Sequence, residues 1–385
     1  MAKETTVKKY DILVVGAGLY GATCARLLTE KGYKCLVVEK NGYVGGMCAT
    51  KKMHGIDVHI NGPHTFHTND PVVWKFVNKY SQFNNYEHVE TMLSNGRMWT
   101  LPIDTKAYNM MFGSLTAINA YNELSKEIKN YNVKKPSSLE DSLVMQYGVS
   151  LYTEVFKPYY EKKFGMPCGS LAASMPDMQP SYYRLTTKMH DTKMQGIPVN
   201  GYTALVENII GDDIPIMLDK DFVNDFAKMQ DLAEVIIYTG PVDRLCKYVH
   251  GPLKWSSLEV KTVDESMRGT HIYGNAVTKV ADKANPMLRI TEHKWFTPER
   301  EDDENWSKKN IVSYEQHKEW KVDEDPFYSI NDTESTGLYK KYVEFINEKW
   351  PNIVLGGTKG MYVNMRMDET IKAAMETCSI ASLNN

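Results

Sequence analysis

The sequence predicts an α/β protein in which a Rossmann-like domain with a parallel sheet is joined to a helical insertion and an antiparallel β-sheet domain. Three observations lead to this prediction. Residues 9–39 follow the pattern strand, glycine-rich loop, helix, strand; residues 104–160 place apolar side chains at helical spacing; and short β runs fill residues 180–330. A chain of 385 residues is expected to form two to three units, because one domain usually takes about 150 residues.

The composition is that of an ordinary folded protein. Hydrophobic residues make up 42% and charged residues 24%, which excludes a disordered chain or a disulfide scaffold. The net charge of -3 leaves no overall basic field to hold a nucleic acid. The six cysteines show no C-x-x-C pair and predict reduced thiols and no metal site. Since no apolar run could span a bilayer or act as a signal peptide, we expect a cytoplasmic protein without a membrane span.

The first predicted strand, residues 9–15, leads directly into the G-x-G-x-x-G loop of Gly16, Gly18 and Gly21, and a helix over 22–31 follows. These glycines suit a tight turn, close approach of the backbone to a pyrophosphate, and close packing of helix on strand. Glu39 ends the second strand, where a carboxylate can accept hydrogen bonds from ribose hydroxyls. We therefore predict a dinucleotide site, with an ordinary glycine-rich turn as the alternative.

The nature of the dinucleotide is indicated by a second glycine-rich loop, which follows Glu39 and contains Gly45 and Gly46. A nicotinamide-binding unit usually continues into another helix and strand at that point. The continuation is similar to the FAD-binding start of the amine oxidase and sugar mutase superfamily, in which the glycines let the backbone pass close to the flavin. FAD is therefore favoured over NAD.

A further motif, Asn-Gly-Pro-His-Thr-Phe-His-Thr-Asn at residues 61–69, follows an alternating strand. It resembles a segment that UDP-galactopyranose mutases carry beside the flavin. The resemblance continues in the family's order at residues 196–205, 238–243, 274–277, 289–294 and 325–328. It implies a mutase that interconverts the pyranose and furanose forms of a nucleotide-diphosphate sugar. In this family the N5 atom of reduced FAD attacks the anomeric carbon, and an external reductant such as NAD(P)H or dithionite keeps the flavin reduced.

The same resemblance implies roles for individual residues, and a homodimer as the assembly. The implied catalytic residues are Arg289, His64 and His67. The implied substrate-binding residues are Phe164, Tyr328, Arg184, Asn364 and Arg366. The implied cofactor-binding residues are Gly16, Gly18, Gly21, Glu39, Lys40, Gly45, Gly46, Met47, His64, Val223, Thr239, Gly240, Gly357 and Met365.

The residues themselves leave alternatives open. His64 and His67 lie three apart in extended backbone, so they are expected to point to opposite sides, and one of them is expected to be structural. Arg289 lies in an alternating strand, from which a guanidinium can reach a diphosphate through two hydrogen bonds. The alternative for Arg289 is a surface salt bridge with Glu292 or Glu299.

The sequence departs from the family pattern on the substrate side. Phe164 stands where the family has Trp, the family's mobile-loop Arg falls near Met178, and residues 363–368 replace Arg-Tyr-Leu-Asp-Met-Asp by Val-Asn-Met-Arg-Met-Asp. A changed nucleotide sugar follows, with Arg184 or Arg366 as replacement cations or, alternatively, as solvated surface arginines. Two other functions stay open: an amine-oxidase-like flavin oxidoreductase and a non-catalytic flavoprotein.

The expected organisation is discontinuous. Residues 1–85, 200–245 and 335–385 are expected to form the FAD-binding domain, residues 100–180 the helical insertion, and residues 86–99, 181–199 and 246–334 the antiparallel sheet domain. Further helices are expected over residues 71–80, 139–147 (capped by Ser138 and Asp141), 338–349 and 368–381. Further strands are expected over 235–238, 255–260, 270–273, 288–290, 311–314 and 353–357, with a solvated loop at 299–304.

Overall fold

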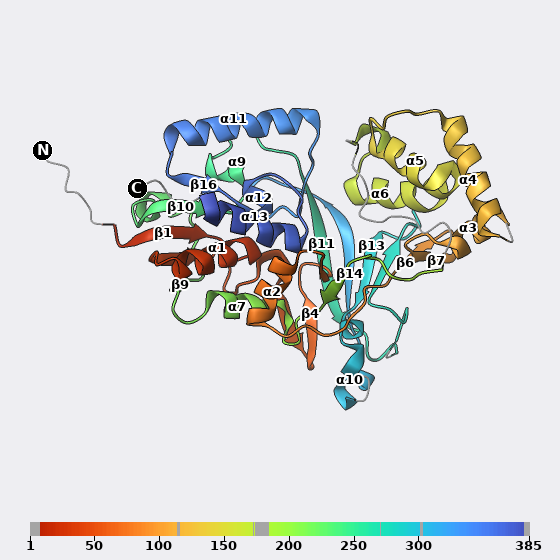
Figure 1. Cartoon of the computed structure of the whole chain (residues 1–385), viewed down its shortest axis with the longest axis horizontal. Coiled ribbons are helices and arrows are strands. Elements are labelled where there is room, and N and C mark those ends of the chain that lie inside the picture. Colours follow the sequence, from red (N-terminus) through yellow and green to blue (C-terminus); the bar gives the residue numbers. More distant parts are fainter. Residues whose placement is uncertain are drawn as a thin grey trace, which may run out of the picture.

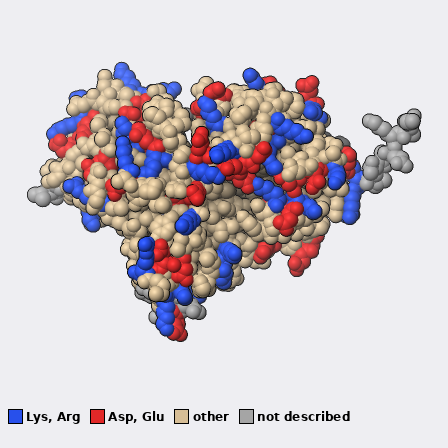
Figure 2. Space-filling view, turned by 180° about the vertical axis from the view of Figure 1, so that it is seen from behind, with Lys and Arg blue, Asp and Glu red and all other residues tan. Residues whose placement is uncertain are grey.

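The computed structural model describes residues 8–113, 116–171, 173, 185–269, 271–300 and 303–380. A parallel sheet with its helices forms one end of the molecule and a bundle of helices forms the other, with a second sheet between them (Figure 1). From the opposite side, Figure 2 shows a hollow between the two lobes, with acidic and basic side chains intermixed around it. No helix within the described ranges has the length and apolar character needed to cross a membrane.

The predicted Rossmann-like sheet is confirmed. Its five strands lie in the order β16-β10-β1-β2-β9 and every neighbouring pair is parallel. One face, with Ile12 and Val14, packs against α1, α7 and α13, and the other, with Leu13 and Val15, packs against α9 and α11. Burial on both faces explains why these strands are continuous apolar runs. The bounds are β1 Tyr10–Val15, β2 Cys35–Val38, β9 Ile216–Met217, β10 Ala233–Tyr238, β16 Ile353–Leu355, α1 Leu19–Glu30, α7 Gly201–Ile210, α9 Val242–Leu245, α11 Thr333–Lys349 and α13 Met367–Ile380.

The second sheet has seven strands in the order β15-β11-β14-β13-β12-β6-β7. It is antiparallel as predicted except for β12 and β6, which run parallel. A parallel pair needs a long crossover between its strands, and the helical insertion lies within the chain that joins these two. The bounds are β6 Glu90–Ser94, β7 Arg97–Leu101, β11 Trp255–Asp264, β12 Val277–Val280, β13 Met287–Glu292, β14 Ile311–Glu319 and β15 Tyr328–Ser329.

One local prediction is wrong and another is right only in part, since the described residues of its segment are exposed or half-exposed but its ends are helical. Residues 271–273 form no strand, because the buried Glu292 carboxylate accepts the backbone N–H groups of Ile272, Tyr273 and Gly274 at 2.9, 2.6 and 3.3 Å and holds them in a turn. The segment expected as a solvated loop at 299–304 contains the end of a 3₁₀ turn, η5 (Pro298–Arg300), and the start of α10 (Glu304–Lys308).

The helical insertion consists of α3 (Thr105–Phe112), α4 (Ala117–Tyr131), α5 (Leu139–Leu151), the π-helical turn η2 (Tyr152–Phe156) and α6 (Lys157–Phe164). The predicted Ser138–Asp141 capping box starts α5. The insertion shares a core with β6 and β7 through Met92 and Trp99. Lys162 of α6 also ties it to the sheet, since its ammonium group donates to the carbonyls of Val280, Asp282, Asn285 and Met287 at 2.8 to 2.9 Å.

The remaining elements lie mostly around the Rossmann-like sheet. The helix α2 has the predicted bounds, Pro71–Tyr80, and starts at the Asp70 cap. All six cysteines are buried free thiols. The other bounds are β3 Thr50–Met53, β4 Ile56–His59, β5 Phe66–Thr68, β8 Met194–Gly196, α8 Phe226–Met229, α12 Gly357–Gly360, η1 Gly46–Cys48, η3 Cys168–Ser170 and η4 His293–Phe296.

Candidate active site

The two glycine-rich loops lie against each other at the carboxyl end of β1. A Cβ atom on Gly16, whose φ is +104°, would lie 2.1 Å from the Thr239 hydroxyl oxygen, and one on Gly21 would lie 2.0 Å from the Gly16 carbonyl oxygen. A Cβ on Gly46 would approach the Gly18 Cα to 3.0 Å, and Gly18 forms a parallel bridge with Gly45. A side chain on Gly46 would therefore crowd the first loop, and one on Gly16 or Gly21 would collide with Thr239 or with the loop's own backbone.

This arrangement fits a dinucleotide. Gly18 is the N-cap of helix α1 and offers no side-chain cap, so N–H groups of the first turn point at the loop, where a pyrophosphate is favoured by the helix dipole. Glu39 is buried, and its carboxylate accepts the backbone N–H groups of Ala17 at 2.8 Å and Asn41 at 2.9 Å. Because a carboxylate oxygen can accept more than one hydrogen bond, Glu39 joins both loops and can still accept from a ribose.

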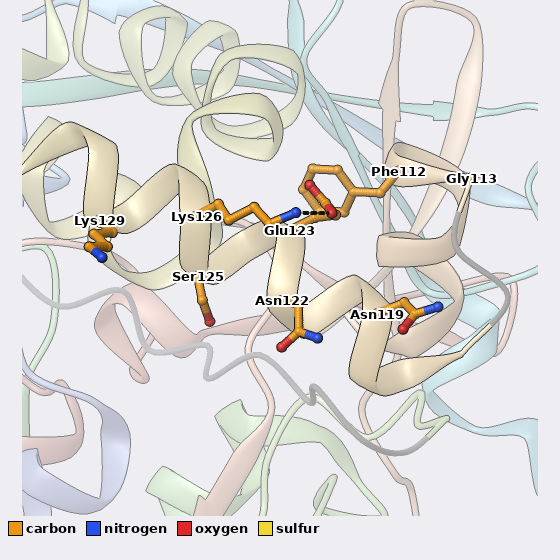
Figure 3. Close-up of a pocket in the computed structure, with 8 residues that line it drawn as sticks. All are labelled: Phe112, Gly113, Asn119, Asn122, Glu123, Ser125, Lys126 and Lys129. Atoms are coloured by element: carbon orange, nitrogen blue, oxygen red, sulfur yellow. Dashed lines mark hydrogen bonds and ion pairs between the residues drawn. The ribbon is translucent and has the colours of Figure 1, made fainter.

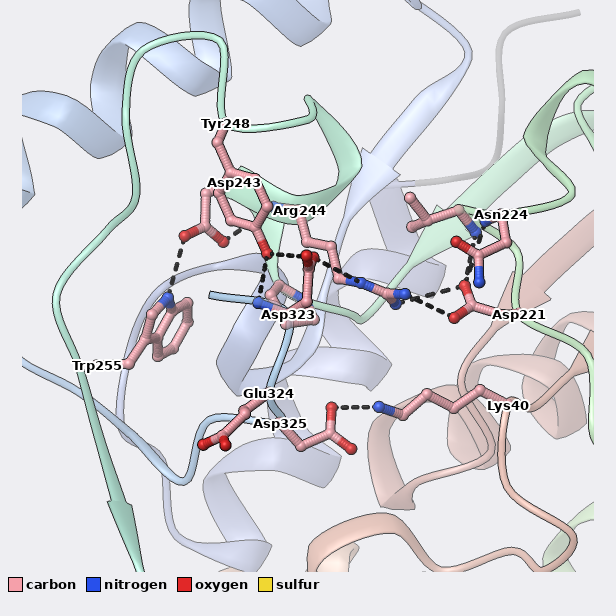
Figure 4. Close-up of polar contacts among 12 residues, drawn as sticks. Lys40, Asp221, Asn224, Asp243, Arg244, Tyr248, Trp255, Asp323, Glu324 and Asp325 are labelled. Carbon is pink, nitrogen blue, oxygen red and sulfur yellow. Dashed lines mark hydrogen bonds and ion pairs between the residues drawn. The ribbon is translucent and has the colours of Figure 1, made fainter. Parts of the chain in front are cut away.

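Charged side chains surround the same sheet edge (Figure 4). Lys40, which follows Glu39, forms an ion pair with Asp325, and Arg244 of α9 pairs with Asp221 at 2.7 Å. The Asp221 carboxylate also accepts the backbone N–H of Val223 at 3.0 Å. The segment with Asp325 therefore connects the loop after β2 to the strand β15 of the second sheet.

Other residues expected at the cofactor lie nearby or support this edge. Thr239 donates its hydroxyl to the Val15 carbonyl at 2.8 Å, and a Cβ on Gly357 would lie 3.2 Å from the Thr239 Cβ. Gly240 lies against the Tyr238 ring, where a Cβ would be 2.6 Å from the hydroxyl oxygen. Met47 is in the turn η1, and Met365 follows α12.

Arg289 lies in β13 and binds Glu315, not Glu292 or Glu299. Its Nε and Nη2 donate to the two Glu315 carboxylate oxygens at 2.9 and 2.6 Å, and Glu315 is almost fully buried. Burial opposes the charge of Arg289, but Glu315 outweighs it and raises the arginine pKa. Tyr328 lies beside the pair, and burial raises the pKa of its hydroxyl. The guanidinium is thus held charged and in a fixed orientation.

Tyr328, which lies beside Arg289, has a second aromatic side chain, Phe164, near it. The Lys163 ammonium lies 5.0 Å from the Tyr328 ring centroid and 5.2 Å from that of Phe164. Asn364 exchanges two hydrogen bonds with the Ser329 backbone, at 3.2 and 3.0 Å, and so holds the loop after α12 next to Tyr328. Tyr328 and Phe164 therefore lie close together, whereas the Asn364 amide is engaged with the backbone.

The two motif histidines have separate surroundings, as expected from their spacing. His64 lies near Arg289, with its Nδ1 2.8 Å from the Gly62 carbonyl oxygen, and burial lowers its pKa to about 4. His67, in β5, stacks on His190 at a centroid distance of 3.5 Å, and His190 stacks in turn on His88 at 5.6 Å. His190 and His88 were not predicted, since nothing in the local pattern links them to His67.

Of the two expected replacement cations, the structure describes only Arg366, which pairs with carboxylates of its own segment. Arg366 is exposed and pairs with Asp368 and Glu369 at 3.2 and 3.1 Å. It lines a groove of about 920 Å³ together with His67 and His190. Arg184 and Met178, the position aligned with the family's loop arginine, lie outside the described residues.

A second concavity, of about 730 Å³, lies between α3 and α4 on the helical insertion (Figure 3). Its charged side chains include Lys126 and Glu123, which pair with each other at 2.6 Å. Neither the glycine loops nor Arg289 contributes to its lining, which is Phe112, Gly113, Asn119, Asn122, Glu123, Ser125, Lys126 and Lys129. We place the candidate active site at the glycine loops and Arg289, where the loops fit a dinucleotide and Glu315 fixes the guanidinium.

Comparisons with known proteins match this arrangement. A family model described as UDP-galactopyranose mutase matches residues 154–363, and one described as an NAD(P)-binding Rossmann-like domain matches residues 14–80. The crystal structure of a reduced UDP-galactopyranose mutase superposes with a TM-score of 0.71 at 15% identity, covering 97% of this chain and 96% of that one.

Two curated relatives extend the match in sequence. A Klebsiella pneumoniae protein named "Probable UDP-galactopyranose mutase" is 30% identical over 372 residues, covering 95% of this chain and 93% of the relative. An Escherichia coli dTDP-fucopyranose mutase is 27% identical over 384 residues, covering 97% of this chain and 99% of the relative. The chain is an isomerase and belongs to the UDP-galactopyranose mutase family of flavin-dependent sugar mutases.

Proposed function

We propose that this protein interconverts the pyranose and furanose forms of a nucleotide-diphosphate sugar, with UDP-galactopyranose or a related nucleotide sugar as substrate. The observation that carries the proposal is the short connection between two sites. Asp325 pairs with Lys40 at the dinucleotide edge, and Tyr328, three residues later, lies beside Arg289. A cofactor between the glycine loops and a diphosphate at Arg289 would therefore be neighbours.

The protein's own residues then have distinct tasks. The glycine loops and Glu39 would hold the FAD, which when reduced supplies the nucleophilic N5 atom for the anomeric carbon. Arg289 would stabilise the charge that develops on the diphosphate leaving group, since Glu315 fixes its guanidinium in place. Tyr328 and Phe164 would exclude water beside it. His64, kept neutral by burial, would serve as a hydrogen-bonding group instead of a cation.

The similarity to a dTDP-fucopyranose mutase supports a second candidate substrate, a dTDP-linked deoxysugar. The departures on the substrate side, such as Phe164 for Trp, fit a substrate other than UDP-galactose. We also propose a homodimer, which light scattering of the purified protein would test, and reduction of FAD by NAD(P)H, which anaerobic bleaching of the flavin absorbance would test.

The function is tested by incubating the dithionite-reduced protein with UDP-galactose, dTDP-fucose and other nucleotide pyranoses, and separating furanose products by chromatography. We expect conversion by the reduced and not by the oxidised protein, without net consumption of reductant. Steady oxygen or acceptor consumption with an amine substrate would instead indicate a flavin oxidoreductase. FAD binding without conversion of any nucleotide sugar would indicate a non-catalytic flavoprotein.

A further inference from the structure

A second cation lies beside Arg289 on the same face of the seven-stranded sheet. Lys279 of β12 is directly opposite Arg289 of β13, and Arg289 is directly opposite Glu315 of β14. Residues directly opposite each other in antiparallel strands share a face, with Cβ atoms about 4.5 to 5.5 Å apart. Lys279 also contacts Glu90 of the next strand, β6, at 2.5 Å. The four side chains form a charged row in the order Glu90, Lys279, Arg289, Glu315.

Within the charged row the cations are more accessible than the carboxylates. The side chains of Lys279 and Arg289 are 14% and 17% exposed, whereas those of Glu90 and Glu315 are 8% and 1% exposed. The two carboxylates are thus more deeply buried than the cations with which they form ion pairs. Lys279 faces α6 of the helical insertion, where its ammonium lies 5.7 Å from the Tyr159 ring centroid. The charged row therefore faces α6, the helix that ends at Phe164.

Glu90 is kept ionised in this buried position. Burial raises the pKa of Glu90, but Lys279 and a hydrogen bond from His88 Nε2 at 3.1 Å outweigh it and hold that pKa well below its usual value. Lys279 consequently has a permanent negative partner. A second anion that reaches Lys279 would add to its hydrogen bonds, because an ammonium group has three donors.

Arg289 serves only part of a diphosphate. Its Nε and Nη2 are directed at Glu315, so one bidentate edge of the guanidinium is occupied, and three N–H donors on Nη1 and Nη2 lie outside this pair. A diphosphate has two charged groups, and each is best stabilised by a nearby donor. An adjacent ammonium would supply the donor for the second phosphate.

We propose that Lys279 is a substrate-binding residue that holds one phosphate of the nucleoside diphosphate while Arg289 holds the other. The proposal rests on the proposed function. Lys279 would supply the cation that the loop arginine supplies in other members of the family. The competing explanation is that Lys279 serves only to neutralise Glu90. The two differ in a measurable way, because only the first makes Lys279 distinguish a diphosphate from a monophosphate.

The test is titration calorimetry of the oxidised, FAD-loaded protein with UDP, UMP, dTDP and dTMP. We expect Lys279→Met to weaken diphosphate binding by about tenfold or more, the loss of one charge-assisted hydrogen bond, and monophosphate binding by less than about threefold. Lys279→Arg should retain most of the preference. Lys318→Met is the matched control, since Lys318 lies on the opposite face of β14 and pairs with Glu324 at 2.9 Å.

Because Lys279→Met leaves a buried carboxylate unpaired, the same titrations are made with Glu90→Gln and with Glu90→Gln/Lys279→Met. Glu90→Gln alone should bind UDP as well as or better than the unmodified protein, and the double variant should lose the diphosphate preference. Equal UDP affinity in the single and double variants, or equal weakening of UDP and UMP, would overturn the assignment of Lys279. Failure of the unmodified protein to bind any of the four nucleotides would instead overturn the proposed function as well.

Discussion

The ion pair between Arg289 and Glu315 predicts that Arg289→Ala lowers both the stability of the fold and kcat/KM, each through a different lost contact. Removal of one partner leaves Glu315, which is 1% exposed, as an uncompensated buried charge, and such a loss costs about 3 to 5 kcal/mol. The loss of a charge-assisted contact with the diphosphate costs a further 1.5 to 3 kcal/mol, roughly, in the transition state. At about 1.36 kcal/mol per tenfold, kcat/KM should fall by about ten- to 150-fold.

The assay separates the two effects. Thermal unfolding followed by circular dichroism gives the stability change, and initial rates of the reduced protein, measured well below its midpoint, give kcat/KM. Arg289→Met/Glu315→Gln removes both charges, so it should recover stability but not activity. Arg289→Lys should recover part of the activity, because lysine keeps the charge but lacks the planar fork. Near-normal kcat/KM in a folded, FAD-loaded double variant would refute the role of Arg289 at the diphosphate.

Three further predictions follow from the buried polar groups. Glu39→Ala should weaken FAD retention because the Ala17 N–H loses its acceptor, and the flavin absorbance left after gel filtration measures this; undiminished retention would show that Glu39 is dispensable. Burial lowers the pKa of His64 to about 4 and of His190 to about 3, so the unfolded chain binds more protons below about pH 6.5. The free energy of unfolding should therefore fall by at most about 1.36 kcal/mol per pH unit for each histidine, and the melting temperature should fall with it. A melting temperature that stays constant from pH 6.5 to 4.5 would contradict this. Lys162→Met should leave several carbonyls without a donor and destabilise the fold by about 3 kcal/mol or more, whereas the exposed control Lys126→Met should change it by less than about 1 kcal/mol; equal melting temperatures would show that the Lys162 contacts are not stabilising.

The dinucleotide site could be predicted from the sequence because its parts are local. Gly16, Gly18 and Gly21 lie between a strand and a helix that the apolar pattern already predicts, and the closest contact of Gly21 is with the backbone of Gly16, five residues earlier. The same holds for the Ser138 cap of α5, where side chain and backbone partners are neighbours in sequence. Patterns of this kind need no knowledge of distant residues.

The partners of Arg289 and Lys279 were decided by the tertiary structure alone. An alternating pattern predicts which face of a strand a residue occupies, but strand order and register determine its neighbours. Glu315 and Glu90 reach the two cations because β14 and β6 flank β13 and β12 in the sheet, although β6 ends at Ser94 and β12 begins only at Val277. His67 meets His190 through the pairing of β5 with β8. These contacts depend on how the sheets assemble, since the free energy of register comes from burying whole faces and not from any short run of residues.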